Sequence, residues 1–357
     1  LEEVVLGCIQ EAAGVAVSDY DEPLMDAGMD SLSAVEFRNL LQTKVEEVKI
    51  PGTLIFDYPT VTAIVEFLGK SLGDPVAGPV VQGSAQRSED TTLAVVGMAC
   101  RFPGSSTTLA KFWAMLLAET DCTAEIPHDR FAIDAFYAPA PTKGMMYVRH
   151  GAFIDGVDLF DAAFFGISTA EAAMMDPQQR HLMEVAYWAM LDAGVDKKAA
   201  MGSATGVFFG ICSNDFAVLS TDMEGAFLGT GMAYSIAANR VSFVLGLKGP
   251  SMSCDTACSS SLVATYVAHR SLANADCERA VVGGVNMCLT ARNFVNFCAA
   301  RMLSPDGKCK TFDEAANGYV RGEGCGAVLL RRAADVKEAD GVYAHLLGSA
   351  VNQDGRT

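Results

Sequence analysis

The spacing of hydrophobic residues in the first 72 positions predicts a small helical bundle. Apolar side chains recur every three or four residues, so that they share one face of a helix. A second stripe follows the helix-start signal Pro59-Thr60. The two stripes consist of Ala34, Phe37, Leu41 and Val45, and of Val61, Ile64, Val65 and Leu68.

From Leu93 onward, short β-branched apolar runs alternate with helix patterns, which predicts an α/β fold around a largely buried sheet. Asp176-Pro177 supplies an N-cap and a first-turn proline for a helix that stops at Gly194. Another helix carries the apolar stripe Leu109, Phe112, Trp113 and Leu116. The expected strands are Leu93–Ala99, Gly206–Gly210, Pro250–Cys254, Arg279–Gly283 and Gly326–Leu330.

Between these two regions, residues 74–92 lose helical periodicity and gain Pro, Gly, Ser and Gln. This composition is typical of an exposed linker. About 17 extended residues reach roughly 50–60 Å. We therefore expect a helical domain over 1–73, a linker over 74–92 and an α/β domain over 93–357.

Composition narrows the class of protein. The chain has 357 residues, of which 50% are hydrophobic, enough for two or three domains with buried cores. Its longest apolar runs, such as Leu93 to Cys100, fall far short of the roughly 20 residues that a membrane span needs. The acids after Leu1 do not suit a signal peptide. We expect no membrane span and a cytoplasmic location, with an organelle as the alternative.

The net charge is −17, which argues against a nucleic-acid partner because phosphate binding needs a basic surface. Residues 1–75 hold 14 acidic and four basic side chains. The leading domain is therefore strongly acidic for its size.

Eleven cysteines are scattered along the chain without zinc-ligand spacing near histidines. Cys100, Cys254, Cys288 and Cys325 sit in apolar runs that look like buried strands. We expect reduced thiols and no metal.

The first candidate site is Ser31, which lies in the first turn of an acidic amphipathic helix, directly after Asp30 in the N-cap position. Taken alone, Ser31 is explained as an ordinary helix-start serine. Together with Gly28, Leu32 and the later stretch FDYPTVTAIVEFL, however, it resembles the acyl or peptidyl carrier proteins over nearly all of residues 1–72. The resemblance implies covalent 4′-phosphopantetheine on Ser31, attached by a phosphopantetheinyl transferase.

A helix N-terminus also suits the added phosphodiester, because free N–H groups and the helix dipole favour negative charge. The acidic residues Glu36, Glu46 and Glu47 leave two interpretations open. They form a solvated face, or they are recognised by basic partner surfaces.

The second candidate site is Cys258, which lies in a small-residue turn between an apolar strand and a long helix. That position favours thiolate, the reactive form. A buried structural cysteine is the alternative, and it suits Cys254 better. The segment resembles the β-ketoacyl synthases of type I polyketide synthases from about Leu93 to Thr357. The motifs that carry the resemblance are DTACSSSL, LAVVGMACRFPG, YVRHGAFIDGVDLFDAAFFGIS, MDPQQR, SIAANR, LSPDGKCKTFDEAANGYVRGEGCGAVLL and VNQDG.

This resemblance implies a thiolase-like layered α/β fold and a ketosynthase homodimer. It also implies that Cys258 accepts an acyl chain from a carrier thioester. A carbanion from a decarboxylating malonyl-type thioester then attacks the acyl-enzyme in a Claisen condensation, with the Cys258 N–H as one oxyanion donor. Acyl thioesters, an acyltransferase and other synthase domains are the expected partners.

The family's two catalytic histidines, one in an HGTGT-type motif, and the lysine between them have no counterpart motif here. We assign none of the five histidines as the base: His128, His150, His181, His269 and His345. The sequence is expected to be a fragment of a longer multienzyme with an incomplete ketosynthase. Alone it should not condense, and residues 93–357 should expose apolar faces and be unstable.

The glycine-rich stretch Gly322, Gly324 and Gly326 superficially resembles a phosphate loop, but no Lys-Ser/Thr follows. We expect tight backbone packing there. Two roles for Glu323 stay open: orienting active-site groups, as in the family, or a solvated turn carboxylate.

Two other functions remain as alternatives. A fatty-acid-type synthase would share both sites. A non-condensing acyl-transfer or scaffold module would keep Cys258 and lack the histidines in its full-length gene.

Overall fold

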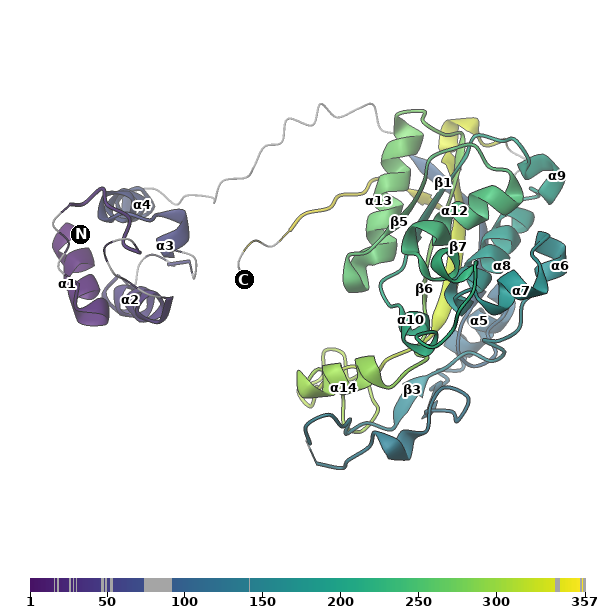
Figure 1. The fold of residues 1–357 in the computed structure, drawn as a ribbon. Coiled ribbons are helices and arrows are strands. Elements are labelled where there is room, and N and C mark those ends of the chain that lie inside the picture. The colour runs from purple at the N-terminus through teal and green to yellow at the C-terminus, as the bar shows by residue number, and fades with distance from the viewer. Residues whose placement is uncertain are drawn as a thin grey trace. The chain divides into compact units, whose positions relative to one another are not determined.

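The computed structural model describes residues 1–73, 92–353 and 355, apart from positions 16, 18, 26, 28, 30, 46, 47, 49, 52, 53, 141 and 338–340. Of residues 31, 32, 35, 56, 72 and 73 it describes the backbone only. The chain forms two compact units, one containing helices α1 to α4 and the other containing the strands (Figure 1). All of the expected linker except Thr92 lies outside the described residues.

The leading unit is a helical bundle, as the spacing predicts. Its apolar stripes meet in one core, in which Phe37, Leu41, Ile64 and Leu68 are completely buried. Arg38 and Gln42 donate to backbone carbonyls of residues 45–50 and fasten that stretch to α2. The helices are α1 (Glu2–Ala13), α2 (Ser31–Lys44), α3 (Leu54–Asp57) and α4 (Val61–Gly73).

The second unit is built on a mixed sheet, which among the described residues has six strands in the order β5-β4-β6-β7-β1-β8. β4 is parallel to β5 and β6, whereas β6-β7, β7-β1 and β1-β8 are antiparallel. All five expected strands are present. The strands are β1 (Leu93–Arg101), β4 (Thr205–Gly210), β5 (Ser251–Cys254), β6 (Arg279–Asn286), β7 (Gly324–Arg332) and β8 (Ala344–Leu346).

Helices cover both faces of this sheet. α8 (Pro177–Asp192) and α12 (Tyr234–Leu245) pack on one face over the largest core, and α13 (Ser260–Ala273) packs on the other (Figure 1). The N-cap prediction for α8 is confirmed, because Asp176 accepts a hydrogen bond from the Gln178 N–H at 2.8 Å.

Shorter elements complete the unit. A third core lies around the two-stranded sheet β2-β3 and α14. The remaining elements are α5 (Leu109–Leu117), β2 (Thr123–Glu125), β3 (His150–Ala152), α6 (Ala162–Phe165), α7 (Thr169–Ala173), α9 (Lys197–Ala200), α10 (Asp215–Leu219), α11 (Leu228–Met232), α14 (Arg292–Ala299), and the 3₁₀ turns Ile133–Ala135, Ala257–Ser259 and Ala333–Asp335.

Some apolar side chains that a helix pattern would place in a core are exposed. The stripe on α5 forms a helix but buries no residue, and Trp113 is 61% exposed. Phe243 on α12 and Leu262 on α13 are also exposed. These are the exposed apolar faces expected of residues 93–357, whereas the expected instability stays a prediction.

Candidate active site

Cys258 lies at the carboxyl end of the parallel strands, in the position that the sequence predicts. β5 ends at Cys254, and Cys258 follows in the 3₁₀ turn Ala257–Ser259, immediately before α13. The Cys258 side chain is exposed, whereas Cys254 is only half-buried. Because β5 is an edge strand, the expectation of a fully buried Cys254 is wrong.

The turn holds a strained backbone. Ala257, directly before the cysteine, has φ of 55°, a left-handed conformation that costs a non-glycine residue roughly 1–2 kcal/mol. The Ser260 hydroxyl donates to the Ala257 carbonyl at 2.6 Å and accepts from the Thr256 N–H at 2.9 Å. Ser259 donates to the Thr256 carbonyl at 2.9 Å. These bonds hold the thiol at the tip of the turn.

Two glycines bring this turn onto the sheet. A Cβ atom at Gly210, the last residue of β4, would lie 2.5 Å from the Ser261 backbone nitrogen. A Cβ at Gly284 on β6 would lie 3.0 Å from the Ser261 Cβ. The first turn of α13 can therefore rest on the ends of β4 and β6, and the sheet fixes the place of Cys258.

The N-terminus of α13 has no side-chain cap: Ser259, its N-cap residue, makes no capping hydrogen bond. The first N–H groups of a helix have no partner within the helix, and they carry partial positive charge. The start of α13 can therefore stabilise an anion that forms next to Cys258.

Other ionisable side chains surround this thiol. Cys212 follows β4, and the protein around it partly desolvates its thiol and raises its pKa, as do the nearby Asp255 and Cys258. Burial raises the pKa of Tyr319, and Cys258 adds to that effect. Burial also raises the pKa of Tyr234 to about 12, with contributions from Asp255 and Cys212.

Two buried carboxyl groups lie behind this layer. Burial raises the pKa of Asp176 to about 6, against the hydrogen bonds from Gln178 that favour its carboxylate. Burial also raises the pKa of Asp215, which accepts hydrogen bonds from the Thr290 N–H and the Asn293 side chain, both at 3.0 Å.

Glu323 is the centre of a buried network, so the solvated-turn alternative is wrong. Its side chain is fully buried and forms a bidentate ion pair with Arg130, with both bonds at 2.8 Å. It also accepts from the N–H groups of Ile154 and Cys288, both at 3.1 Å. The carboxylate thereby joins the β3 region to the segments that follow β6 and precede β7.

The same network ties the glycine-rich stretch to the sheet. Asn286, at the end of β6, donates to the Gly322 carbonyl at 2.7 Å and accepts from Ser213 at 2.8 Å. A Cβ at Gly324 would lie 2.9 Å from the Phe102 ring. The prediction of tight packing is confirmed at Gly324, while Gly322 has room for a Cβ.

None of the histidines hydrogen-bonds to Cys258 in the described part of the chain. His181 is fully buried on α8 beside Arg101 and Glu184. His269 is buried on α13 and bonds to Ser349 at 2.7 Å. His128, His150 and His345 are exposed.

All eleven cysteines are free thiols. Within the described residues, no group of three or more His, Cys, Asp and Glu side chains is arranged to hold a metal ion. The same residues contain no helix long and apolar enough to cross a membrane.

Ser31 is the first residue of α2, a helix of 14 residues. Its backbone is therefore at a helix N-terminus, as the sequence predicts, and Glu36 on the same helix is exposed. Gly28, Asp30, Glu46 and Glu47 lie outside the described residues, so the expected Asp30 N-cap and the two interpretations of the acidic face stay predictions.

The sequence indicated Glu323 as one candidate for orienting the site, but not its partner Arg130 nor the contact between Asn286 and Ser213. Arg130 and Glu323 are 193 positions apart, and Asn286 is 73 positions from Ser213. The available signal for Glu323 was its place between two glycines just before the apolar run Ala327 to Leu330. No residue near Glu323 in the sequence indicated that Arg130 is its partner.

Two family models match the chain. Residues 90–336 match the model described as "Beta-ketoacyl synthase, N-terminal domain", and residues 3–68 match "Phosphopantetheine attachment site". The second model indicates a 4′-phosphopantetheine group attached covalently to a serine.

Curated relatives are large synthases. The chain is 42% identical to polyketide synthase GfsE of Streptomyces halstedii and 43% identical to mycoketide-CoA synthase of Mycobacterium tuberculosis, over 99% and 94% of its own length. It spans only 10% and 8% of those two proteins.

Solved structures of ketosynthase domains also match the chain. The ketosynthase from module 6 of the bacillaene synthase of Bacillus subtilis 168 matches with a TM-score of 0.67 and 39% identity, covering 74% of this chain and 44% of that one. An oxazolomycin ketosynthase domain of Streptomyces albus JA3453 matches with a TM-score of 0.66 and 38% identity, over 70% and 45%. The second unit therefore has the thiolase-like fold.

Proposed function

Because the chain belongs to the β-ketoacyl synthase family, we propose that it is the carrier and the leading ketosynthase part of a polyketide synthase module. Cys258 is the acyl acceptor and Ser31 carries the 4′-phosphopantetheine. One observation carries the proposal for Cys258: an exposed thiol on a strained, serine-held turn at the uncapped start of α13.

The acceptor step follows from this geometry. The Cys258 thiolate attacks the carbonyl carbon of an acyl thioester, a new C–S bond forms, and the carrier thiolate leaves. Negative charge on the carbonyl oxygen is stabilised by backbone N–H groups, including that of Cys258. Capture divides a difficult acyl transfer into two easier steps.

In the condensation, a malonyl-type thioester loses carbon dioxide, and the resulting carbanion attacks the acyl group on Cys258. A C–C bond forms and the Cys258 thiolate leaves. The family's two histidines and lysine, which serve this decarboxylation, match no motif of this chain. We therefore expect the 357-residue chain to accept acyl groups without condensing them.

Residues of α2 fit the proposed prosthetic group. Ser31 starts a 14-residue helix, whose free N–H groups suit a phosphodiester. When attached by a phosphopantetheinyl transferase, the group supplies a thiol that holds acyl chains as thioesters. We propose a carrier domain over 1–73, a linker over 74–92 and a truncated ketosynthase over 93–357.

An edge strand supports a ketosynthase homodimer. β5 lies at the end of the sheet order, and its Met252 side chain is exposed. An unpaired edge is a template for a strand of a second copy. An acyltransferase and other synthase domains are the remaining partners, and the proposed location is cytoplasmic.

The test is acyl capture by the 357-residue chain, measured by intact mass after incubation with a short acyl-pantetheine thioester. The wild type and Cys212→Ser should gain one acyl group, and Cys258→Ser should gain none. Equal acylation of Cys258→Ser would refute the assignment. A phosphopantetheinyl transferase with coenzyme A should modify the wild type but not Ser31→Ala.

A fatty-acid-type synthase and a non-condensing transfer module make the same two predictions. The parent gene beyond Thr357 separates them. The catalytic histidines together with polyketide processing domains support the proposal, and a ketosynthase without those histidines supports the transfer module.

A further inference from the structure

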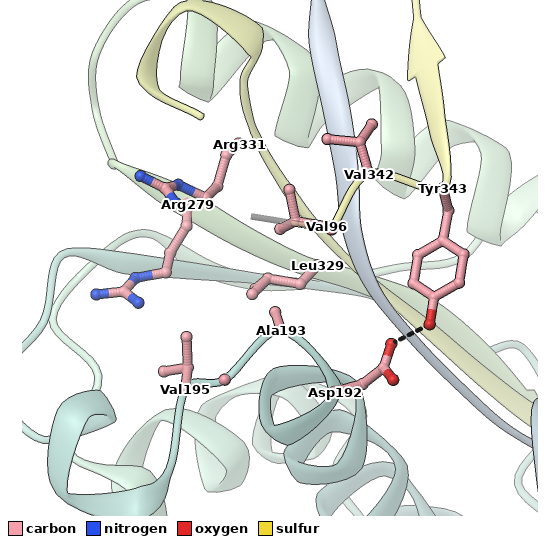
Figure 2. Close-up of a pocket in the computed structure, with 11 residues that line it drawn as sticks. Val96, Asp192, Ala193, Val195, Arg279, Leu329, Arg331, Val342 and Tyr343 are labelled. Carbon is pink, nitrogen blue, oxygen red and sulfur yellow. Dashed lines mark hydrogen bonds between the residues drawn. The ribbon is translucent and has the colours of Figure 1, made fainter. Parts of the chain in front are cut away.

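A cavity lies at the end of the sheet remote from Cys258. β6 begins at Arg279, which lines the cavity, and ends at Asn286, which belongs to the network around the active site. The cavity has a volume of about 580 Å³, a size typical of small-molecule sites. Its middle is apolar, formed by Val96, Val195 and Leu329 (Figure 2).

One end of the cavity is lined by two arginines. Arg279 on β6 is the direct cross-strand neighbour of Arg331 on β7, and like charges in that position destabilise a sheet. Partial burial lowers the pKa of Arg279, and Arg331 lowers it further. Arg331 donates to the Asp335 carbonyl at 2.8 Å.

Among the described residues, no carboxylate forms an ion pair with Arg279. Glu278 is next to it in sequence and favours its charge, but the Arg279 guanidinium makes no ion pair or side-chain hydrogen bond within the described residues. Asp335, at the rim, is paired with Arg332 at 2.7 Å. A half-buried guanidinium without a partner therefore faces the cavity.

The opposite end of the cavity is negative and already satisfied. Asp192 accepts a hydrogen bond from the Tyr343 hydroxyl at 2.9 Å (Figure 2). It also accepts one from the Met98 N–H at 2.9 Å. A ligand that places an anion on Arg279 would extend its other end toward Asp192. A second anionic group at that end would be repelled.

We infer that this cavity binds a single-headed oxyanion carried on a short apolar chain, with the head on Arg279 and the chain over Val96 and Leu329. A guanidinium fork matches a carboxylate or a phosphate equally well. The site is distinct from the thioester chemistry at Cys258 and does not depend on it.

Calorimetric titration of the 357-residue chain tests the inference with four probes. Hexanoate and hexyl phosphate should bind, and the tighter of the two identifies the head group. Hexanol, which lacks the charge, and adipate, which adds a second carboxylate, should each bind at least about tenfold more weakly than hexanoate, a difference of one charged hydrogen bond.

Variants locate the site. Arg279→Gln should abolish hexanoate binding, Arg279→Lys should weaken it, and Arg292→Gln, which removes an exposed arginine on α14, should leave it unchanged. Thermal unfolding without ligand verifies that each variant is folded. Undetectable binding of both anions to the wild type, full binding to Arg279→Gln, or hexanol or adipate binding as tightly as hexanoate would overturn the inference.

Discussion

Two long helices of the second unit begin in opposite ways. α8 starts with a buried carboxylate, Asp176, which accepts from the Gln178 N–H. α13 starts with an exposed thiol, Cys258, and its N-cap residue Ser259 makes no capping bond. We call the N-terminus of α8 the closed helix start, because a side chain caps it, and the N-terminus of α13 the open helix start, because no side chain caps it.

The difference lies in what satisfies the first N–H groups. In α8 the Asp176 side chain accepts a hydrogen bond from one of them, the Gln178 N–H. In α13 the serine hydroxyls stabilise the turn, and the N–H groups stay available for a developing oxyanion. Stability and reactivity are thus assigned to different helix starts in one fold.

The largest expected effect concerns the buried ion pair between Arg130 and Glu323, which lies outside both helix starts. Glu323→Gln should leave the buried Arg130 guanidinium with the exposed Asp129 as its remaining ion-pair partner and destabilise the protein by about 3 kcal/mol. Denaturant unfolding measures the change. Glu314→Gln, at an exposed position, is the control and should change stability by less than about 0.5 kcal/mol. Similar losses in both variants would contradict the role of the buried pair.

The closed helix start predicts a pH dependence. Asp176 has a pKa of about 6 in the folded chain against 3.8 as its ordinary value, so the folded state binds more protons between these pH values. Its contribution to stability is therefore complete below pH 3.8 and is lost as pH rises through 6. Asp176→Asn should flatten the fall in stability between pH 4 and 6. An unchanged slope would show that Asp176 is not its source.

The open helix start should depend on Ser260. Ser260→Ala removes the hydroxyl that bonds to both Thr256 and Ala257, and should destabilise the protein by about 1–2 kcal/mol. It should also slow acyl capture at Cys258, because the turn loses its fixed geometry. Ser261→Ala is the neighbouring control, for which we expect an unchanged capture rate. Equal capture rates in the wild type, Ser260→Ala and Ser261→Ala would show that acyl capture at Cys258 does not depend on the geometry of this turn.

The smallest effect concerns the backbone before the cysteine. Ala257→Gly relieves the left-handed strain and should change stability by less than about 1 kcal/mol in the favourable direction. Ala264→Gly in the middle of α13 should instead destabilise by about 1 kcal/mol or more. Thermal unfolding compares the two, and a loss in both would mean that Ala257 is not strained.

The features of the fold and of the site that the sequence predicted are those that depend on local patterns. β-Branched apolar runs gave the five main strands, and Asp176-Pro177 gave the start of α8, because these signals depend on neighbours in sequence. The Cys258 turn was predictable for the same reason. Ser31 was placed correctly at the start of α2, while its attached group remains a proposal.

Long-range contacts were not predictable. The Arg130–Glu323 pair depends on strands brought together by the fold, so Glu323 kept an incorrect alternative. The half-burial of Cys254 depends on the position of β5 at the edge of the sheet, which the residues around Cys254 do not indicate. The exposed α5 stripe looked like any core-facing helix, because the apolar spacing is the same whether or not the rest of the fold covers it.

The most direct test compares three exposed thiols in the wild-type chain: Cys212, Cys258 and Cys309. After brief exposure to a limiting amount of an acyl thioester, peptide mass spectrometry measures the acylated fraction of each. The account predicts that Cys258 is acylated at least about tenfold faster than the other two, since only Cys258 lies at an uncapped helix start. Equal acylation of the three thiols would contradict it.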